Sequence, residues 1–194
     1  MSGSLLNHTH SRAGLKTFRA LTRVLTFRRA AVARGCPSVL YLRLMNTKQD
    51  VEDFLAQKTL AIVGLSRDEK AMSSNVNKEL KAKGYHMLPV NPNAESIAGE
   101  KCYANLAALP EKVGGVLVFT APAQTEKVVR EAASLGITRV WLQQGAQSDA
   151  ALAVCKEKGL QVVSGKCIMM FAEPVATFHG VHRWFAKVFG QLPK

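Results

Sequence analysis

The chain has 194 residues and a formal net charge of +12, and 47% of its residues are hydrophobic. This length accommodates one domain of ordinary size plus extensions, and the composition favours a soluble α/β or α+β domain. No apolar run approaches the roughly 20 residues of a membrane span, and the charge is too unevenly placed for a nucleic-acid-binding surface.

The positive charge is concentrated in the first 48 residues, which contain nine Lys and Arg residues and no Asp or Glu. The rest of the chain carries 17 basic and 14 acidic side chains, so its charge is nearly balanced. We therefore expect neither a nucleic acid nor a membrane as partner. The four cysteines contain no CxxC pair, which argues against a disulfide scaffold and against a zinc site.

Residues 1–44 are rich in Arg, Ser and Ala, which is the composition of a mitochondrial transit peptide. Because a second methionine follows at Met45, an alternative interpretation is that the natural chain begins there. A basic arm is a weaker third idea, since Gly35 and Pro37 interrupt the pattern. In each case we place this segment outside the domain, which we assign to residues 45–194. We expect a cytoplasmic protein, or a mitochondrial one if the transit peptide is genuine.

The domain begins with a helix and a strand. Thr47 and Asp50 have nearly the spacing of a capping box and predict a short helix with Val51, Phe54 and Leu55 on one face. The apolar run TLAIV, residues 59–63, then predicts a buried strand that ends at a glycine. The next helix is expected over residues 73–83, with an apolar stripe facing the sheet: Met72, Val76 and Leu80.

Strands and helices alternate through the rest of the domain. Residues 85–90, YHMLPV, predict the second strand. After the segment 94–114 we expect a strand over 115–119, a helix over 124–135, a strand over 138–142, a helix over 148–158 and a strand over 160–163. The helix over 124–135 would bury one apolar side: Val128, Val129, Ala132 and Leu135.

This alternation of nearly all-apolar strands with helices predicts an α/β fold, a Rossmann-like doubly wound sheet of about five parallel strands. The C-terminal tail adds an amphipathic helix, because its apolar residues follow the i, i+3, i+4, i+7, i+8 series: Val181, Trp184, Phe185, Val188 and Phe189. That helix would dock on the domain or form the interface of a homodimer.

Four loops follow predicted strands and therefore share the carboxyl edge of the sheet: Gly64-Leu65-Ser66, Asn91-Pro92-Asn93, Thr120-Ala121-Pro122 and Gln143-Gln144-Gly145. Open α/β sheets bind ligands at this edge, where the strand order reverses. Gly64 permits a sharp turn and a close approach of a ligand, and a helix starting near Ser73 would direct free amides at that turn. We therefore expect the ligand to carry phosphate.

The sequence argues against a nicotinamide dinucleotide as this ligand. The GxGxxG fingerprint is absent, and Asn91 stands where an acidic residue would bind the ribose 2′-hydroxyl. Arg67, Lys70 and Lys78, with the hydroxyls of Ser73 and Ser74, add positive charge and donors around the first turn. This favours a ligand with more phosphate than NAD.

Several segments carry a resemblance: IVGLS, the SS pair that opens a helix, GYHMLPVNPN, GEKCYANLAALPE, VFTAP and WLQQG. From about Gln49 to Cys167 the chain resembles the small bacterial coenzyme-A-binding proteins. These are stand-alone relatives of the coenzyme-A-binding domain of succinyl-CoA synthetase α subunits and acyl-CoA synthetases. The resemblance implies a Rossmann-like domain that binds the nucleotide part of coenzyme A, or of an acyl-CoA, across the four loops.

The resemblance also implies roles for individual residues. The pyrophosphate would be held by the first turn and the following helix start: Gly64, Leu65, Ser66, Ser73 and Ser74. Val90, Asn91 and Pro92 would flank the adenosine. The pantetheine would pass along the third and fourth loops: Phe119, Thr120, Pro122, Gln144 and Gly145. Some relatives carry an arginine where this chain has Thr120, so phosphate contacts at that position are in question.

No catalytic constellation is apparent in the sequence. The chain has no Ser-His-Asp order, paired carboxylates or P-loop, His86 lies in a predicted strand, and Cys167 is more readily explained as a core residue than as a reactive thiol. His179 and His182 lack the further ligands that zinc requires. We expect a binding protein. The alternatives are an NAD(P)-dependent oxidoreductase, or a subunit of an acyl-CoA synthetase that needs a separate partner.

Overall fold

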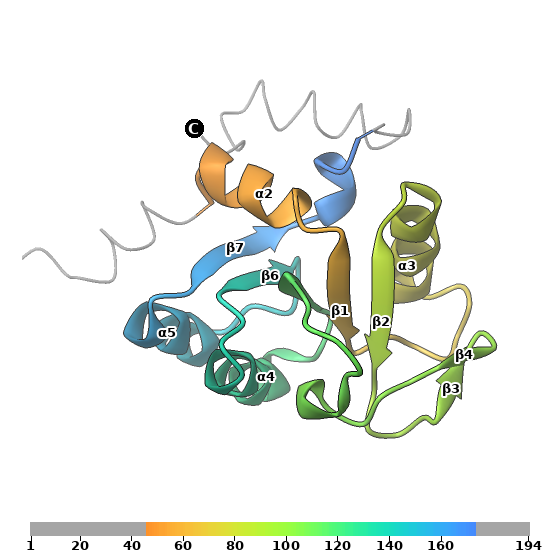
Figure 1. The fold of residues 1–194 in the computed structure, drawn as a ribbon. Coiled ribbons are helices and arrows are strands. Elements are labelled where there is room, and N and C mark those ends of the chain that lie inside the picture. The colour runs from red at the N-terminus through yellow and green to blue at the C-terminus, as the bar shows by residue number, and fades with distance from the viewer. Residues whose placement is uncertain (1–45, 174–194) are drawn as a thin grey trace, which may run out of the picture. The chain divides into compact units, whose positions relative to one another are not determined.

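The computed structural model describes residues 46–173. Their centre is a five-stranded sheet in the order β2-β1-β5-β6-β7, with every neighbouring pair parallel (Figure 1). The predicted α/β fold with five parallel strands is confirmed. The predicted basic extension, residues 1–44, and the predicted C-terminal helix with its homodimer interface lie outside the described residues.

The elements follow one another along the chain as α2 (Lys48–Leu55), β1 (Thr59–Val63), α3 (Met72–Ala82), β2 (His86–Val90), β3 (Ser96–Ile97), β4 (Glu100–Lys101), η1 (Leu106–Ala108), β5 (Gly115–Val118), α4 (Pro122–Ser134), β6 (Arg139–Gln143), α5 (Asp149–Lys158), β7 (Gln161–Lys166) and η2 (Ile168–Met170).

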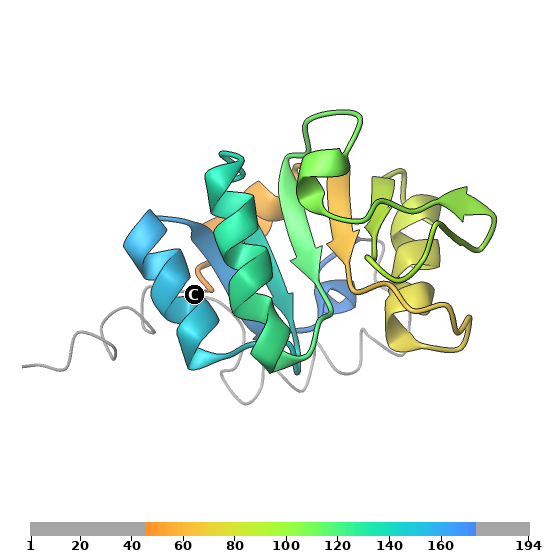
Figure 2. The same cartoon turned by 90° about the horizontal axis from the view of Figure 1, so that it is seen from below.

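Helices cover both faces of the sheet, as a doubly wound fold requires. Figures 1 and 2 show α4 and α5 side by side on one face, and Figure 1 shows α2 and α3 on the other. Each face has its own core, and successive strand residues belong to different ones: Ala61 and Val140 to the first, Ile62 and Trp141 to the second. Burial on both faces explains why the strands are nearly continuous apolar runs.

The predicted cap of the first described helix is confirmed, and the predicted start of α4 is shifted. Thr47 Oγ1 accepts a hydrogen bond from the backbone N–H of Asp50 at 3.1 Å, and the Asp50 carboxylate accepts one from the Thr47 N–H at 2.9 Å. This is the predicted capping box. Helix α4 begins two residues before the predicted Gln124, because Pro122 occupies its first position, where a missing N–H costs nothing.

Two residues of the predicted apolar stripes are not buried. Met72 is 61% exposed and Leu135 is 45% exposed, whereas Val76 and Val129 are buried as expected. Met72 is the first residue of α3 and Leu135 is the C-cap of α4. The spacing of apolar residues places both on the side of the helix that faces the sheet. Each lies at an end of its helix, however, where the sheet no longer covers it.

The segment between β2 and β5 contains structure that the sequence did not predict. Strands β3 and β4 form a short antiparallel hairpin, and η1 follows it. Between them Tyr103 runs parallel to the end of β2, since its N–H donates to Pro89 O at 2.9 Å and its carbonyl accepts from the Asn91 N–H at 2.8 Å. This pairing brings Ala104 and Asn105 to the carboxyl edge of the sheet.

The strand order reverses between β1 and β5. From β1 the chain proceeds outward to β2, then returns past β1 to β5 and continues in the opposite direction to β6 and β7. The connections after β1 and β5 therefore leave the sheet on opposite faces, which opens a crevice between them at the carboxyl edge.

Candidate functional site

A cleft of about 660 Å³ lies at this switch point. Its lining comes from the carboxyl ends of β1, β2 and β5, from the segment after Tyr103, and from α4: Val63, Gly64, Val90, Asn91, Pro92, Asn93, Ala104, Asn105, Phe119, Thr120, Ala121, Gln124, Lys127, Val128 and Glu131. The volume is in the range of sites for small molecules and cofactors.

Gly64 lines the cleft at the point where the loops after β1 and β5 approach each other. Its φ is +87°, in the region that favours glycine, and a Cβ placed on it would lie 2.9 Å from Thr120 N and 3.0 Å from the Phe119 carbonyl carbon. The glycine is therefore needed for two reasons, the turn itself and the close approach of the β5 loop. Its N–H donates to Val90 O at 3.1 Å, which ties the turn to β2 as well.

Asn91 fixes the adjoining wall of the cleft. Its Nδ2 donates to Leu65 O at 2.9 Å, and its Oδ1 accepts from the Asn93 N–H at 2.9 Å. The side chain thus joins the turn after β1 to the turn after β2. An ionised acidic residue at this position could not donate a hydrogen bond to Leu65 O. Asparagine is therefore suited to this position by its hydrogen bond as well as by its lack of charge.

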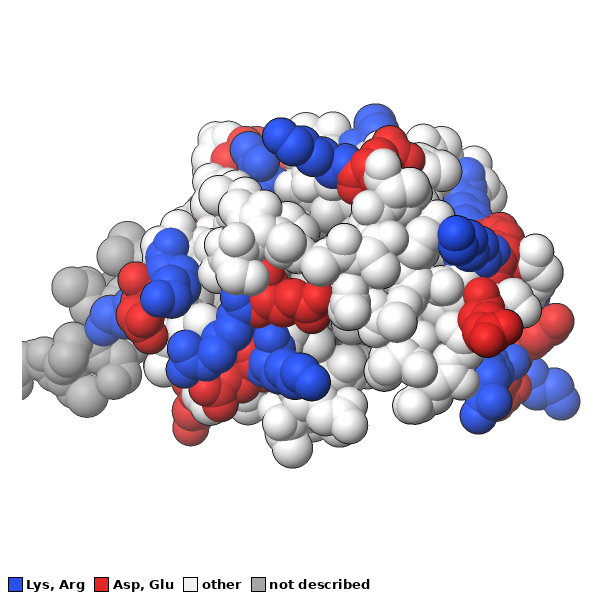
Figure 3. Space-filling model, turned by 60° about the horizontal axis from the view of Figure 1, so that its bottom comes forward, with Lys and Arg blue, Asp and Glu red and all other residues white. Residues whose placement is uncertain are grey.

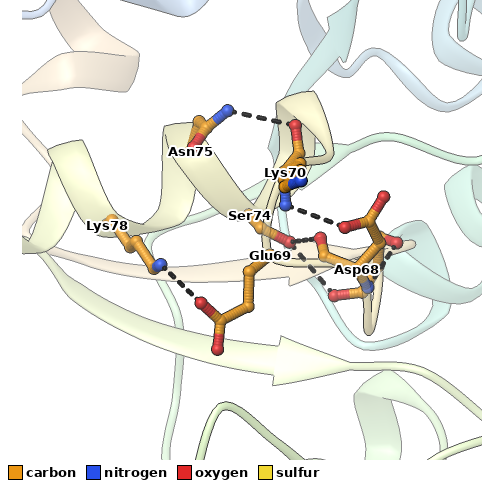
Figure 4. A network of polar contacts seen from close by, with 7 residues as sticks. Asp68, Glu69, Lys70, Ser74, Asn75 and Lys78 are labelled. Carbon is orange, nitrogen blue, oxygen red and sulfur yellow. Dashed lines mark hydrogen bonds and ion pairs between the residues drawn. The ribbon is translucent and has the colours of Figure 1, made fainter.

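Ser73 and Ser74 lie at the start of α3 and are buried, with 5% and 7% exposure. Ser73 Oγ accepts from the Ser66 N–H at 3.0 Å, and Ser74 Oγ donates to the carbonyls of Ser66 and Asp68. Figure 4 shows the Ser74 hydroxyl directed at the Asp68 segment. Both hydroxyls hold the loop after β1 in place, and neither residue lines the cleft.

The cations expected around the first turn also lie outside the cleft. Lys78 pairs with Glu69 at 3.4 Å (Figure 4), and Arg67 and Lys70 are exposed on the same loop. Neither the three cations nor Ser66 belongs to the lining. The loop after β1 is therefore held largely by its own polar groups.

Six of the residues assigned from the resemblance line the cleft together: Gly64, Val90, Asn91, Pro92, Phe119 and Thr120. The other assigned residues do not line it: Leu65, Ser66, Ser73, Ser74, Pro122, Gln144 and Gly145. Leu65 is 1% exposed and belongs to the core of the α3 face, whereas Pro122, Gln144 and Gly145 are exposed.

The wall formed by α4 is the part of the cleft that sequence reasoning missed. Gln124, Lys127, Val128 and Glu131 follow one another at spacings of three, one and three along this helix. Glu131 Oε1 accepts hydrogen bonds from Leu106 N at 2.8 Å and from Ala107 N at 3.3 Å, which fixes η1 against the helix. Their spacing along α4 could have predicted that these four residues share one side of the helix. Only the fold shows that this side faces the end of β2.

A buried hydroxyl connects the third and fourth loops behind the cleft. Thr125 Oγ1 lies 2.7 Å from Ala146 O and 3.0 Å from Thr120 Oγ1, and the residue is fully buried. The Thr125 hydroxyl has one proton, which it donates to Ala146 O, the shorter of the two contacts. The hydrogen bond between the two hydroxyls is therefore donated by Thr120 and accepted by Thr125.

Among the described helices, α3 and α4 are capped differently from α2 and α5. Thr47 caps α2 and Ser148 caps α5, each accepting a backbone N–H. By contrast, α3 and α4 have alanine at the N-cap, Ala71 and Ala121, with no side-chain hydrogen bond. An uncapped N-terminus leaves backbone N–H groups and the positive end of the helix dipole available to an anion.

The described cysteines are distributed between the core and a second, smaller cleft. Burial raises the pKa of the Cys102 thiol, and raises that of Cys155 to about 12. Cys167 is partly buried and lines a cleft of about 290 Å³ with Met72 and Met169. Within residues 46–173 no group of His, Cys, Asp and Glu side chains could hold a metal ion. His179 and His182 lie outside the described residues.

The surface around the site carries charges of both signs. On the face shown in Figure 3, Lys and Arg side chains lie in mixed groups with Asp and Glu, and uncharged surface separates the groups. His86 is exposed at the start of β2 and lies 3.0 Å from Glu111. Among the described residues, no helix combines the length and the apolar character needed to cross a membrane.

Comparison with known proteins identifies relatives over this same region. A protein-family profile described as "CoA binding domain" matches residues 58–173. The uncharacterized protein YneT of Bacillus subtilis is 31% identical over 123 residues, covering 63% of this chain and 91% of YneT. The ADP-forming acetate–CoA ligase II of Archaeoglobus fulgidus is 30% identical over 121 residues, covering 60% of this chain but 18% of the ligase.

Solved structures of small proteins also match this region of the chain. A hypothetical protein from Pyrococcus horikoshii OT3 has a TM-score of 0.63 and 32% identity, and the match covers 66% of this chain and 92% of that one. A protein from Thermus thermophilus has a TM-score of 0.56 and 33% identity, with 61% and 91% of the two chains covered. Both matches cover nearly the whole of a small protein.

Proposed function

This chain belongs to the CoA binding domain family, and from that premise we propose that it binds coenzyme A or an acyl-CoA in the cleft at the β1–β5 switch point without transforming it. The observation that carries this proposal is the position of the cleft. It lies at the carboxyl ends of β1, β2 and β5, where open α/β sheets take up nucleotides.

The electrostatics of the edge support a phosphate-bearing ligand. Helix α4 begins at the cleft, with Ala121 and Gln124 in the lining, and it has no side-chain cap. Asn91 keeps the end of β2 uncharged, so nothing there repels a phosphorylated ribose. An NAD(P)-dependent oxidoreductase is disfavoured by the missing glycine fingerprint and the missing acidic residue.

The polar groups of the cleft are suited to binding more than to proton transfer. Lys127 and Glu131 are the ionisable side chains among its described lining residues, and Glu131 is occupied by two backbone N–H groups. General acid–base or nucleophilic catalysis usually needs a second side chain that positions or activates the reacting group, and Lys127 has no such partner among the described lining residues.

A second candidate is a CoA-binding subunit that works with a separate catalytic partner. It is favoured by the likeness to the archaeal acetate–CoA ligase, of which this chain corresponds to 18%. The rest of that ligase has no counterpart in the match. Co-purification of a tagged chain from its native host, followed by an acyl-CoA synthetase assay of the eluate, would support this candidate, and a chain recovered alone and inactive would count against it.

The direct test is isothermal titration of the full chain with coenzyme A, acetyl-CoA, NAD and NADP. We expect coenzyme A to bind with a Kd below about 1 mM and more tightly than either nicotinamide dinucleotide. No binding of coenzyme A in this range, or tighter binding of NAD, would overturn the proposal.

The location of the site is tested by filling the cleft from its rim. Ala104 is exposed and lines the cleft, so Ala104→Trp should weaken coenzyme A binding at least about tenfold while the chain remains folded. The matched control is Ala108→Trp, at an exposed position of η1 outside the lining. Equal affinities of the two variants would place the ligand elsewhere.

A further inference from the structure

Lys127 is the one cation among the described lining residues of the cleft, and it is exposed. Glu131 lies four residues further along α4, which is the spacing of a helical ion pair. No such pair forms, and Glu131 Oε1 accepts hydrogen bonds from the N–H groups of Leu106 and Ala107. Within residues 46–173 Lys127 forms no ion pair with any side chain.

Neighbouring charges on the same helix are arranged differently. Glu126 and Arg130 pair at 2.8 Å, also with a spacing of four. Those two residues lie outside the lining of the cleft. Glu126 and Arg130 thus neutralise one another outside the cleft, whereas Lys127, which lines it, has no ion-pair partner among the described residues.

Lys127 is also well separated from the other place where α4 can bind an anion. It lies six residues after the N-cap Ala121, or about 9 Å along the helix axis at 1.5 Å per residue. The cleft therefore borders two positions on α4 that favour negative charge, the positive end of the helix dipole and the Lys127 side chain.

We propose that Lys127 binds the 3′-phosphate of the adenosine and so makes the cleft selective for coenzyme A over 3′-dephospho-coenzyme A. This inference rests on the proposed function. Coenzyme A carries its negative charge at two places separated by a ribose, the pyrophosphate and the 3′-phosphate. The pyrophosphate lies toward the N-terminus of α4 and the Gly64 turn, and the 3′-phosphate lies toward Lys127.

The test is titration of the full chain with coenzyme A and with 3′-dephospho-coenzyme A. For the natural chain we expect roughly tenfold tighter binding of coenzyme A, the effect of one charge-assisted contact. Lys127→Met should remove this difference by weakening coenzyme A binding about tenfold and changing dephospho-coenzyme A binding less than about twofold. Lys127→Arg should retain the difference, and Lys127→Glu should reverse it.

The control is Lys48→Met, which removes an exposed lysine from α2 on the other face of the sheet and should change neither affinity. Equal losses for both ligands in Lys127→Met, or no loss, would overturn the assignment of Lys127 while leaving coenzyme A binding intact. If the natural chain binds neither ligand, the proposed function fails. The two failures are therefore distinguishable.

Discussion

Gly64 shows at the scale of one residue how the turn after β1 depends on the whole sheet. Its positive φ and its contact with the β5 loop both exclude a side chain. Gly64→Ala should lower the free energy of unfolding by about 2–5 kcal/mol, the sum of left-handed strain and overpacking. Urea unfolding of the purified variant measures this loss.

Gly84 supplies the matched control for that substitution. Its φ is +82°, nearly that of Gly64, but a Cβ there would meet nothing within 4 Å. Gly84→Ala should cost only the backbone strain, about 1–2 kcal/mol. If the two variants lose equal stability, the contact between Gly64 and Thr120 has no energetic importance.

Cys155 links burial to the pH dependence of stability. Its thiol has a pKa of about 12 in the folded chain, against 9.0 for an unperturbed thiol, because burial disfavours the thiolate. The unfolded chain therefore loses this proton first. The free energy of unfolding is therefore unaffected by this thiol below about pH 9. Between about pH 9 and about pH 12 it falls by roughly 1.4 kcal/mol per pH unit, because only the unfolded chain loses the proton there.

Urea unfolding at several values between about pH 8 and about pH 10 should show this decline. Cys155→Ala should be less stable at neutral pH, because it leaves a cavity, but its stability should fall less steeply with pH. Parallel curves for the natural chain and the variant would show that the Cys155 thiol does not titrate differently in the two states.

At the scale of elements, α4 lacks the side-chain N-cap hydrogen bond that α2 and α5 have. Ala121 has the extended backbone of an N-cap, so Ala121→Ser should cap α4 and raise the free energy of unfolding by about 0.5–1 kcal/mol. The new hydroxyl would compete for the N–H groups that we assign to the ligand's phosphate. Coenzyme A affinity should fall, and calorimetric titration measures it.

Ser148→Ala provides the opposite comparison on α5. It removes a hydroxyl that accepts from Ala151 N at 3.2 Å, and it should cost about 1 kcal/mol. Because α5 lies away from the cleft lining, coenzyme A affinity should stay the same. A loss of affinity in this variant, or none in Ala121→Ser, would contradict the role given to the start of α4.

At the scale of the whole molecule, we predict that residues 45–194 contain the folded domain. Asn46 Oδ1 accepts a hydrogen bond from Ser164 N at 2.6 Å, which ties this first described residue to β7. A chain shortened to residues 45–194 should therefore keep its unfolding midpoint in urea and bind coenzyme A within about twofold of the full chain. Loss of folding or of binding would mean that residues 1–44 belong to the functional unit.

The sequence by itself determined the elements and the edge at which the ligand is expected. Apolar runs such as residues 59–63, glycines after them and caps such as Thr47 are local signals, and local backbone energetics act on neighbours in the chain. Alternation of strand and helix then implied a parallel sheet, so the strand ends had to share one edge. Gly64, Asn91 and Thr120 could be grouped on that basis alone.

The tertiary structure decided which groups face one another at that edge. Lys127 and Glu131 became part of the cleft because β5 lies beside β1, which places α4 opposite the end of β2. Ser73 and Ser74 turned out to bind their own loop. Contacts between segments distant in the chain depend on the strand order and on how the two cores pack. The periodicity of a single helix or strand predicts neither of these.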